Sequence, residues 1–171
     1  GNIGASNVLR LLGARAGVLV WVGDCLKGLL PILLARHLFG LEGWELGASG
    51  VAAVAGHCYS PYLKLTGGRG VSTGLGIMLG LYWPVGVCVL LMFVILVAQT
   101  RYISVGSIIA ALSTPLWMTL WHMPLAYAIA AGTAAIIITV RHAPNIQRLM
   151  SGTERKIGQR ETTRQPGEGD E

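Results

Sequence analysis

Long apolar stretches separated by short polar turns dominate the chain. Six such segments can be drawn, at about 16–40, 46–63, 71–83, 84–100, 103–121 and 123–140. A full membrane crossing takes about 20 residues, and the second and third segments are shorter, so we expect tilted or partial spans there. Pro84 and Pro124 stand where short turns would join neighbouring segments. The pattern predicts an all-α, polytopic integral membrane bundle with about six spans.

The composition excludes a soluble domain. Apolar residues make up 53% of the chain and charged residues only 12%, against about 25% charged residues in ordinary globular domains. The 24 glycines are typical of closely packed transmembrane helices. Cys25, Cys58 and Cys88 lack a metal-binding spacing, and an odd count gives no complete disulfide framework. The net charge of +5 is spread through short loops, which argues against nucleic acid as a partner.

The basic residues predict the orientation. If the C-terminus lies in the cytoplasm, all thirteen Lys and Arg residues except Lys27 and Arg36 fall at the cytoplasmic end or in the tail, as the positive-inside rule requires. The polar stretches 1–15, 57–73 and 141–158 then share that side. Residues 1–157 form the predicted transmembrane domain, and 158–171, which lack an apolar period, form a predicted disordered cytoplasmic tail.

A glycine-rich turn carries the strongest local signal. Gly67-Gly68-Arg69-Gly70 would let backbone N–H groups face an anion, with the Arg69 guanidinium adding charge. Ser72 and Thr73 would cap the following helix and offer hydroxyl groups. The Lys-Ser/Thr ending of a Walker-type loop is absent. The alternative interpretation is an ordinary cytoplasmic turn with a positive-inside arginine.

Further polar residues have two interpretations each. Asp24 and Lys27, three residues apart in the first span, form either a structural ion pair or a substrate contact. A loop of small residues near the N-terminus, followed by a cation, provides either substrate contacts or a solvated loop with a helix cap at Ser6 or Asn7. The residues concerned are Asn2, Ser6, Asn7 and Arg10. The histidines His57 and His142, with Asn145 near the latter, are either site residues or ordinary interfacial groups.

The sequence lacks the usual catalytic arrangements. It has no Gly-x-Ser-x-Gly elbow, no paired carboxylates and no cluster of metal ligands. We therefore expect neither a metal nor a cofactor. An enzyme of this kind would work by positioning and electrostatics on a substrate that is already activated.

Four stretches resemble one family. Gly1-Asn2-Ile3-Gly4-Ala5-Ser6-Asn7-Val8-Leu9-Arg10, Asp24-Cys25-Leu26-Lys27-Gly28, Gly56-His57 with the glycine turn, and Arg141-His142-Ala143-Pro144-Asn145 with Arg148 and Glu154 are similar, in order and spacing, to signatures of the bacterial acyl-phosphate:glycerol-3-phosphate acyltransferases, the PlsY family. The resemblance covers about residues 1–158. It implies transfer of a fatty acyl group from acyl phosphate to the 1-hydroxyl of sn-glycerol 3-phosphate, giving lysophosphatidic acid and phosphate for phospholipid synthesis.

The resemblance also implies roles for residues. Arg10, His142 and Asn145 would be catalytic, and Glu154 structural. Substrate binding would fall to Asn2, Ser6, Asn7, Asp24, Lys27, His57, Gly67, Gly68, Arg69, Gly70, Ser72 and Thr73. On physical grounds, cations near both phosphates would stabilise the developing charge, and the hydroxyl proton would go either to a substrate phosphate or to a protein base. The implied location is the bacterial inner membrane, with the site on the cytoplasmic side and a loose coupling to the enzyme that makes acyl phosphate.

The chain departs from the family pattern in three ways. Arg69 stands where Lys is common, and Ser6 where Thr is common. The family also has another span and a Gly-Ser pair ahead of the first signature, so we expect this chain to be truncated at its N-terminus and the complete protein to have seven spans.

Two rival functions use the same features. A small transporter of phosphate or organophosphate would also explain short helices, intramembrane Asp24 and Lys27, and a glycine-rich anion site. The gathering of polar stretches on one side argues against it, because a transporter needs groups near the midplane. A structural membrane subunit would leave the loop signatures unexplained.

Overall fold

The computed structural model describes residues 4–61 and 64–159, apart from the side chain of Arg10. Within these ranges the secondary structure is entirely helical, which confirms the predicted fold class. The six helices are α1 (Ala5–His37), α2 (Gly43–Cys58), α3 (Val71–Thr100), α4 (Ile103–Leu120), α5 (Leu125–Arg141) and α6 (Ala143–Met150). Of the predicted tail, 158–171, only Gly158 and Gln159 fall within the described residues. Asn2, a predicted site residue, lies outside them.

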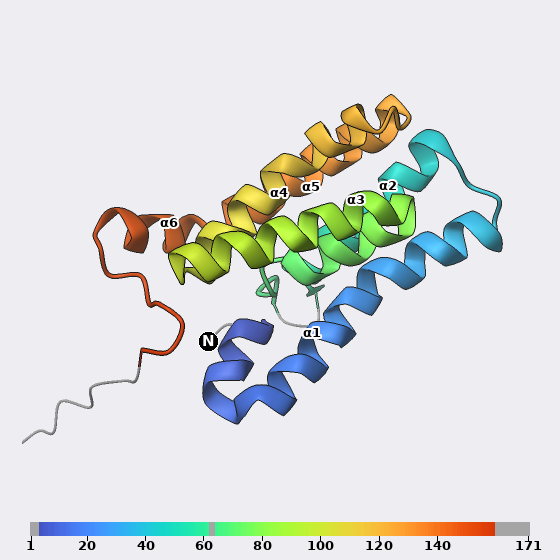
Figure 1. Cartoon of the computed structure of the whole chain (residues 1–171). Coiled ribbons are helices and arrows are strands. Elements are labelled where there is room, and N and C mark those ends of the chain that lie inside the picture. Colours follow the sequence, from blue (N-terminus) through green and yellow to red (C-terminus); the bar gives the residue numbers. More distant parts are fainter. Residues whose placement is uncertain (1–3, 62–63, 160–171) are drawn as a thin grey trace, which may run out of the picture.

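The first helix folds back on itself near its start. Gly13 has φ 84° and ψ 178°, a conformation open to glycine and strained for other residues. The short arm before it returns along the long arm, and a Cβ on Gly17 would stand 2.8 Å from the Cβ of Leu9 (Figure 1). The helix is capped by Gly4 without a side-chain bond, so the alternative interpretation of a cap at Ser6 or Asn7 is wrong.

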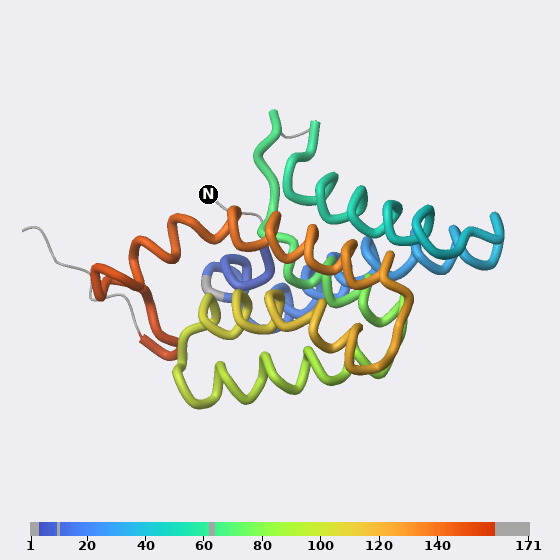
Figure 2. Tube along the Cα trace, turned by 90° about the horizontal axis from the view of Figure 1, so that it is seen from above, coloured from blue at the N-terminus to red at the C-terminus, as the bar shows by residue number. Residues whose placement is uncertain are grey.

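The third helix is also two arms. Tyr82 has non-helical angles, φ −157° and ψ 101°, just before Pro84. A Cβ on Gly86 would lie 2.9 Å from the backbone nitrogen of Leu79, whereas a continuous helix separates residues seven apart by about 10 Å. The chain therefore reverses direction, as Figure 2 shows in green and yellow-green. This agrees with the predicted turn at Pro84 between two apolar segments.

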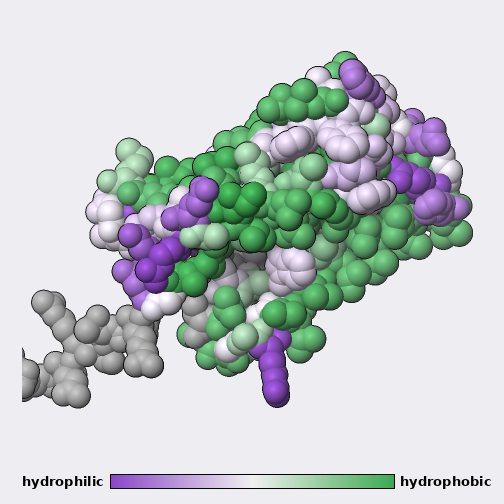
Figure 3. Space-filling view, viewed as in Figure 1, coloured by the Kyte–Doolittle hydropathy of each residue, from purple (hydrophilic) through white to green (hydrophobic). Residues whose placement is uncertain are grey.

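Several helices suit a membrane. By total length and composition alone, three qualify, namely Leu11–His37, Val71–Thr100 and Ile103–Leu120. The second of these is α3, whose two arms run in opposite directions, so it is not a single straight crossing. α5 and α6, bent by 58° at their junction, make a fourth candidate if they are taken as one broken span. α2 has 16 residues, fewer than a full crossing needs, so the count of six spans stays a prediction. Figure 3 shows a broad apolar surface with hydrophilic residues gathered towards its ends.

The turns and loops lie at two opposite ends of the bundle. The links from α1 to α2, between the arms of α3, and from α4 to α5 lie at one end (Figure 1). The short arm of α1, the segment before α3, and α6 with the residues after it lie towards the other. This second end therefore brings together the three polar stretches that the sequence predicts to share one side.

Candidate functional site

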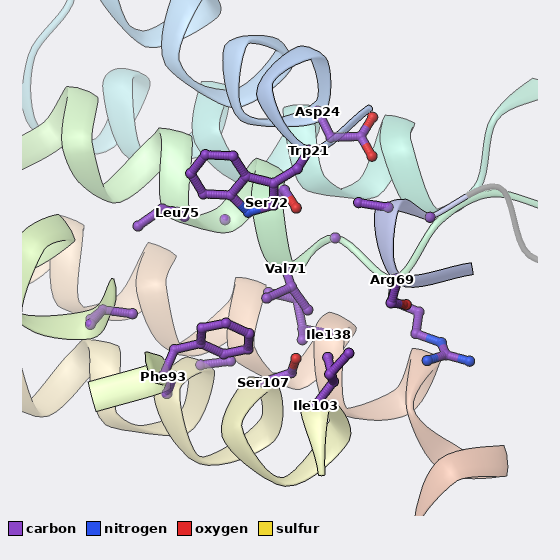
Figure 4. Close-up of a pocket in the computed structure, with 18 of the residues that line it drawn as sticks. Trp21, Asp24, Arg69, Val71, Ser72, Leu75, Phe93, Ile103, Ser107 and Ile138 are labelled. Carbon is purple, nitrogen blue, oxygen red and sulfur yellow. The ribbon is translucent and has the colours of Figure 1, made fainter. Parts of the chain in front are cut away.

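Two adjoining cavities open among the polar stretches. A polar cavity of about 240 Å³ is lined by Ser6, Arg69, Ile103, Ser104, Asn145, Arg148, Glu154 and Arg155. A larger apolar cavity of about 370 Å³ runs between α1, both arms of α3, α4 and α5. Ser6, Arg69 and Ile103 line both cavities. In Figure 4 the Arg69 guanidinium points away from the apolar side chains, at the edge of the larger cavity.

The polar cavity has an excess of positive charge. Three guanidinium groups, from Arg69, Arg148 and Arg155, line it together with one carboxylate, that of Glu154. Guanidinium groups match the oxygens of phosphate in both charge and geometry. The described residues contain no group of three or more His, Cys, Asp or Glu side chains placed to hold a metal ion. The charge balance therefore suits an anion with several oxygens.

Glu154 organises one wall of the polar cavity. Its Oε1 accepts a hydrogen bond from Asn145 Nδ2 at 2.7 Å, and its Oε2 accepts one from Arg148 Nε at 2.7 Å. Burial alone would raise the pKa of Glu154, but these hydrogen bonds and the Arg148 charge outweigh it, so the pKa lies below its ordinary value. The carboxylate is therefore favoured in its ionised form and bonds two neighbours, and its structural role stays a prediction.

Asn145 presents an acceptor to the polar cavity. The residue is 2% exposed, and its Oδ1 is a buried atom without a hydrogen-bond partner. Because the Nδ2 donor is committed to the Glu154 carboxylate, the amide orientation follows from that bond. A buried acceptor left unpaired is unfavourable, so Oδ1 is suited to receive a hydrogen bond from a ligand hydroxyl.

His142 lies at the junction of α5 and α6. It is 1% exposed and borders the apolar cavity. Its Nδ1 lies 2.7 Å from the carbonyl oxygen of Ile138. A carbonyl only accepts, so Nδ1 carries the proton, and Nε2 of the neutral ring is left as an acceptor.

The glycine turn is held by long-range bonds. The Gly68 amide donates to the His57 carbonyl at 3.2 Å. Arg141 donates from Nη2 to the Gly67 carbonyl at 2.9 Å and from Nε to the Gly68 carbonyl at 3.2 Å, and its guanidinium lies 5.3 Å from the Tyr59 ring centre. Gly67 and Gly68 border neither cavity. Their lack of a Cβ serves close packing, because one on Gly68 would stand 2.0 Å from His57 Nε2.

The Asp24 ion pair contacts the glycine turn through His57. Lys27 Nζ donates to Asp24 Oδ1 at 2.9 Å, and His57 Nδ1 lies 3.7 Å from the same oxygen. The Asp24 and His57 side chains are buried and border the apolar cavity, whereas the Lys27 side chain is 62% exposed. The structure thus contains the predicted pair, and links it to the ring that packs on Gly68.

The predicted residues divide by position. Those lining a cavity are Ser6, Asp24, His57, Arg69, Gly70, Ser72, His142, Asn145 and Glu154. Asn7, Lys27, Gly67, Gly68 and Thr73 line neither, and Asn2 and the Arg10 side chain lie outside the described residues. Thr73 is fully buried, with its Oγ1 unpaired. The cap of α3 is Gly70 without a side-chain bond, so the predicted capping by Ser72 or Thr73 is wrong.

Four contributors were missing from the predicted site. Arg141 clamps the glycine turn, and Ser104, Arg148 and Arg155 line the polar cavity. Arg141 and Arg148 stand within a family signature but carry no predicted role of their own, and Arg155 looks like an ordinary positive-inside residue. Only the three-dimensional structure reveals that Arg148 and Arg155 line a cavity with Arg69, and that Arg141 bonds to the glycine turn.

Comparisons with known proteins point to one family. Residues 1–152 match the profile of the family described as glycerol-3-phosphate acyltransferase. The glycerol-3-phosphate acyltransferase of Geobacter sulfurreducens is 46% identical over 159 residues, covering 92% of this chain and 80% of the relative. That of Trichormus variabilis is 38% identical over 179 residues, covering 95% and 79%.

Solved structures show the same fold. Two crystal structures of PlsY, described as an integral membrane glycerol 3-phosphate acyltransferase, are 37% identical to this chain. The lysophosphatidic acid form has a TM-score of 0.88 and the glycerol 3-phosphate form 0.89. Each comparison covers 92% of this chain, and 81% or 79% of the solved one. The chain is therefore an integral membrane protein that belongs to the glycerol-3-phosphate acyltransferase family.

Proposed function

We propose that this protein transfers a fatty acyl group from acyl phosphate to the 1-hydroxyl of sn-glycerol 3-phosphate, releasing lysophosphatidic acid and inorganic phosphate. The observation that carries the proposal is the junction of the two cavities. An arginine-lined polar space opens onto an apolar space, and Ser6, Arg69 and Ile103 border both. Such a junction suits a reaction between a water-soluble phosphate ester and a lipid-tailed phosphate.

The polar cavity is the proposed glycerol 3-phosphate site. Arg148 and Arg155 would hold its phosphate, and Asn145 Oδ1 would accept a hydrogen bond from a glycerol hydroxyl. Arg69, at the junction, would face the phosphate of the acyl donor. Two crystal structures of a relative are described as its glycerol 3-phosphate form and its lysophosphatidic acid form. This supports glycerol 3-phosphate as the acceptor, and the residue roles rest on the cavity lining alone.

The reaction needs no covalent enzyme intermediate. The glycerol hydroxyl oxygen would attack the carbonyl carbon of the acyl phosphate, and the bond from that carbon to the bridging phosphate oxygen would break. The arginines would stabilise the negative charge on the carbonyl oxygen and on the departing phosphate. The hydroxyl proton would leave with the phosphate, which is itself a base close to the reacting oxygen.

Substitution of two histidines tests which group takes the hydroxyl proton. His142 Nε2 is an acceptor beside the apolar cavity, and His57 is tied to Asp24. We expect a doubly substituted protein, His57→Gln with His142→Gln, to keep measurable turnover if substrate phosphate takes the proton. Complete loss of turnover, with glycerol 3-phosphate binding and thermal stability preserved, would instead identify a protein base.

The donor class is tested with the full-length protein, purified and reconstituted in liposomes. Labelled glycerol 3-phosphate is supplied with palmitoyl phosphate in one tube and palmitoyl-CoA in another. We expect labelled lysophosphatidic acid from palmitoyl phosphate only. Product from palmitoyl-CoA alone would reject the proposed donor. Absence of product from both, in a folded protein, would reject the acyltransferase and favour the transporter, whose flux the same vesicles would measure.

A matched pair of variants tests the acceptor site. Arg155 lines the polar cavity, whereas its neighbour Lys156 lies 5.3 Å from the ring centre of Tyr102, outside that cavity. A hydrogen bond to a charged group contributes about 1.5–3 kcal/mol, so Arg155→Ala should raise the KM for glycerol 3-phosphate about 10- to 100-fold. Lys156→Ala should leave that KM within about twofold. Equal effects would refute the assignment of the phosphate site.

The cellular arrangement is part of the proposal. The positive-inside distribution supports an inner membrane location with the site facing the cytoplasm. In a Cys88→Ala background, Ser151→Cys should react with a membrane-impermeant maleimide only in inverted vesicles, and His122→Cys only in intact spheroplasts; the reverse pattern would refute this orientation. A loose coupling to the enzyme that makes acyl phosphate would appear as faster product formation from a mixture of both enzymes than from added acyl phosphate at the same steady concentration.

A further inference from the structure

We propose that the closed end of the apolar cavity, formed by Thr114 of α4 and Ala131 of α5, sets the longest acyl chain that this protein uses efficiently. The inference rests on the proposed function, since it concerns the chain of the acyl donor. It adds a pair of residues that selects among acyl phosphates by the length of their acyl chains.

The cavity walls run as continuous helix faces. On α4 the bordering residues recur at the spacing of one helical face, namely Ile103, Ser107, Ala110, Ala111 and Thr114. On α5 they do the same, as Ala131, Ala134, Ala135, Ile138 and His142. The five alanines are each at most 6% exposed. These two faces line the cavity mostly with small side chains along the helix axes, and we refer to this part of the cavity as the slot.

The slot begins at the polar cavity. Ile103 borders both cavities, and His142 borders the apolar one at the same end of the bundle. An acyl carbonyl placed between the polar and apolar spaces would therefore direct its chain along α4 and α5. Figure 4 shows Ile103, Ile138 and Ser107 on this wall, facing Phe93 and Val71 of the two arms of α3.

The slot ends where large side chains replace small ones. Thr114 Oγ1 lies 3.5 Å from the Ala131 carbonyl oxygen, so the two helices meet there. One turn further along each helix stand Met118 and Tyr127, which are 0% and 7% exposed and belong to the packed core. Neither borders the cavity. A chain that reaches the level of Thr114 meets packed side chains.

The length of the slot gives a chain length. Ile103 and Thr114 are eleven residues apart in α4, which is about 16 Å at 1.5 Å per residue. His142 and Ala131 are also eleven residues apart at the end of α5, so both walls agree. An extended hydrocarbon advances about 1.25 Å per methylene, from C–C bonds near 1.5 Å at tetrahedral angles. The slot accommodates about 13 methylenes, hence an acyl group of about 14 carbons.

Filling the slot should change the chain-length profile in a graded way. Each methylene that loses its apolar contact should lower kcat/KM about fourfold. Thr114→Leu blocks the end of the slot, and Ala111→Leu blocks it three residues nearer the junction. Since three residues are about 4.5 Å, the limit for Ala111→Leu should fall about four methylenes below that for Thr114→Leu.

A lipid-facing threonine provides the matched control. Thr133 on α5 is exposed and donates to the Ile129 carbonyl, one turn back, as Thr114 donates to the Ala111 carbonyl. Thr133→Leu makes the same chemical change outside the slot. We expect it to leave the profile unchanged, so a change specific to Thr114→Leu reports on the slot and not on loss of a threonine.

The experiment measures kcat/KM for an even-numbered series of acyl phosphates, from octanoyl to stearoyl, with glycerol 3-phosphate held in excess. The expected result for Thr114→Leu is a ratio of palmitoyl to decanoyl activity at least about tenfold below that of the wild type. A uniform loss across the series in both cavity variants, or an equal shift in Thr133→Leu, would overturn the proposal.

Two further measurements keep the outcomes distinct. Should Thr114→Leu unfold, the milder Ala131→Val carries the same test, and an unchanged profile in it overturns the proposal. Wild-type turnover with every acyl phosphate, together with unchanged profiles in the folded variants, rejects the slot and leaves the proposed function intact. Absence of wild-type turnover with any acyl phosphate rejects the proposed function, and the slot with it.

Discussion

Gly28 of α1 tests how closely the site-bearing helices pack. A Cβ added at Gly28 would stand 2.0 Å from the carbonyl oxygen of Thr73 and 2.9 Å from its carbonyl carbon. Ordinary van der Waals contact begins at 3.4 Å, so Gly28→Ala must move α1 and α3 apart by about 1.4 Å or bend one of them. The obstacle is backbone, which yields less easily than the end of a flexible side chain.

Gly23 on the same helix supplies the reference. A Cβ at Gly23 would meet no atom within 4 Å. Both substitutions gain the same intrinsic helix preference, about 1 kcal/mol for glycine to alanine, so this contribution cancels between them. The remaining difference is the overpacking at Gly28, about 1–3 kcal/mol. We therefore expect Gly28→Ala to be less stable than Gly23→Ala by about that amount.

Thermal unfolding in detergent measures the difference. Cys25 and Cys58 are buried free thiols, so a dye that becomes fluorescent on reacting with thiols reports unfolding. Gly28→Ala should melt several degrees below Gly23→Ala. Its activity should fall as well, because Asp24 and Ser72 border the apolar cavity beside this crossing. Equal melting temperatures for the two variants would show that α1 and α3 are not in backbone contact, and would refute the reasoning.

Three further predictions concern the end of the bundle that carries the polar cavity. Arg141→Lys should lower kcat/KM about tenfold or more, because one ammonium group cannot hold two carbonyls as the guanidinium does; unchanged kinetics would contradict this. Glu154→Gln should destabilise the protein most near neutral pH: the folded pKa of Glu154 is lowered, so its contribution is present above the unfolded pKa and is lost as the pH falls through the folded pKa. Melting curves at about pH 7 and pH 4 measure this, and a constant difference would contradict it. Arg101 exchanges hydrogen bonds with Ile157, both at 2.8 Å, and Ile157 borders the apolar cavity; Arg101→Ala should therefore expose residues around 157 to limited proteolysis, whereas an unchanged digestion pattern would contradict this.

The sequence predicted the helices well because a membrane imposes simple rules. Each span must satisfy its own backbone hydrogen bonds and present apolar side chains to lipid, so apolar segments mark helices directly. The reversal of the chain at Pro84 could also be predicted, because proline removes a backbone donor at the point where two apolar segments meet. The reversal of the chain at Gly13 could not be predicted from the sequence. Among 24 glycines nothing in the local sequence distinguishes this one, and its bend depends on packing of Leu9 against Gly17.

The gathering of polar residues at one end also followed from the sequence, but their pairing did not. Charge distribution and an even number of crossings predict which stretches share a side. They do not predict that Arg141 bonds to carbonyls 73 and 74 residues earlier in the chain. Nor do they predict that Arg155 lies in the cavity and Lys156 outside it. Such choices depend on side-chain directions at the ends of helices, which follow from the packing of the whole bundle.

The glycine turn shows what a motif does and does not determine. Adjacent glycines predict a close approach by another group, and a phosphate was the natural candidate for it. In the structure the group that approaches Gly67 and Gly68 is the backbone and ring of His57, and the Gly68 amide is already bonded to the His57 carbonyl. The contribution of the turn to the polar cavity is Arg69, which the glycines and Arg141 hold in place. A glycine-rich stretch thus predicts a rigid, crowded turn, and the identity of its ligand has to be argued from the charged side chains that the turn directs into a cavity.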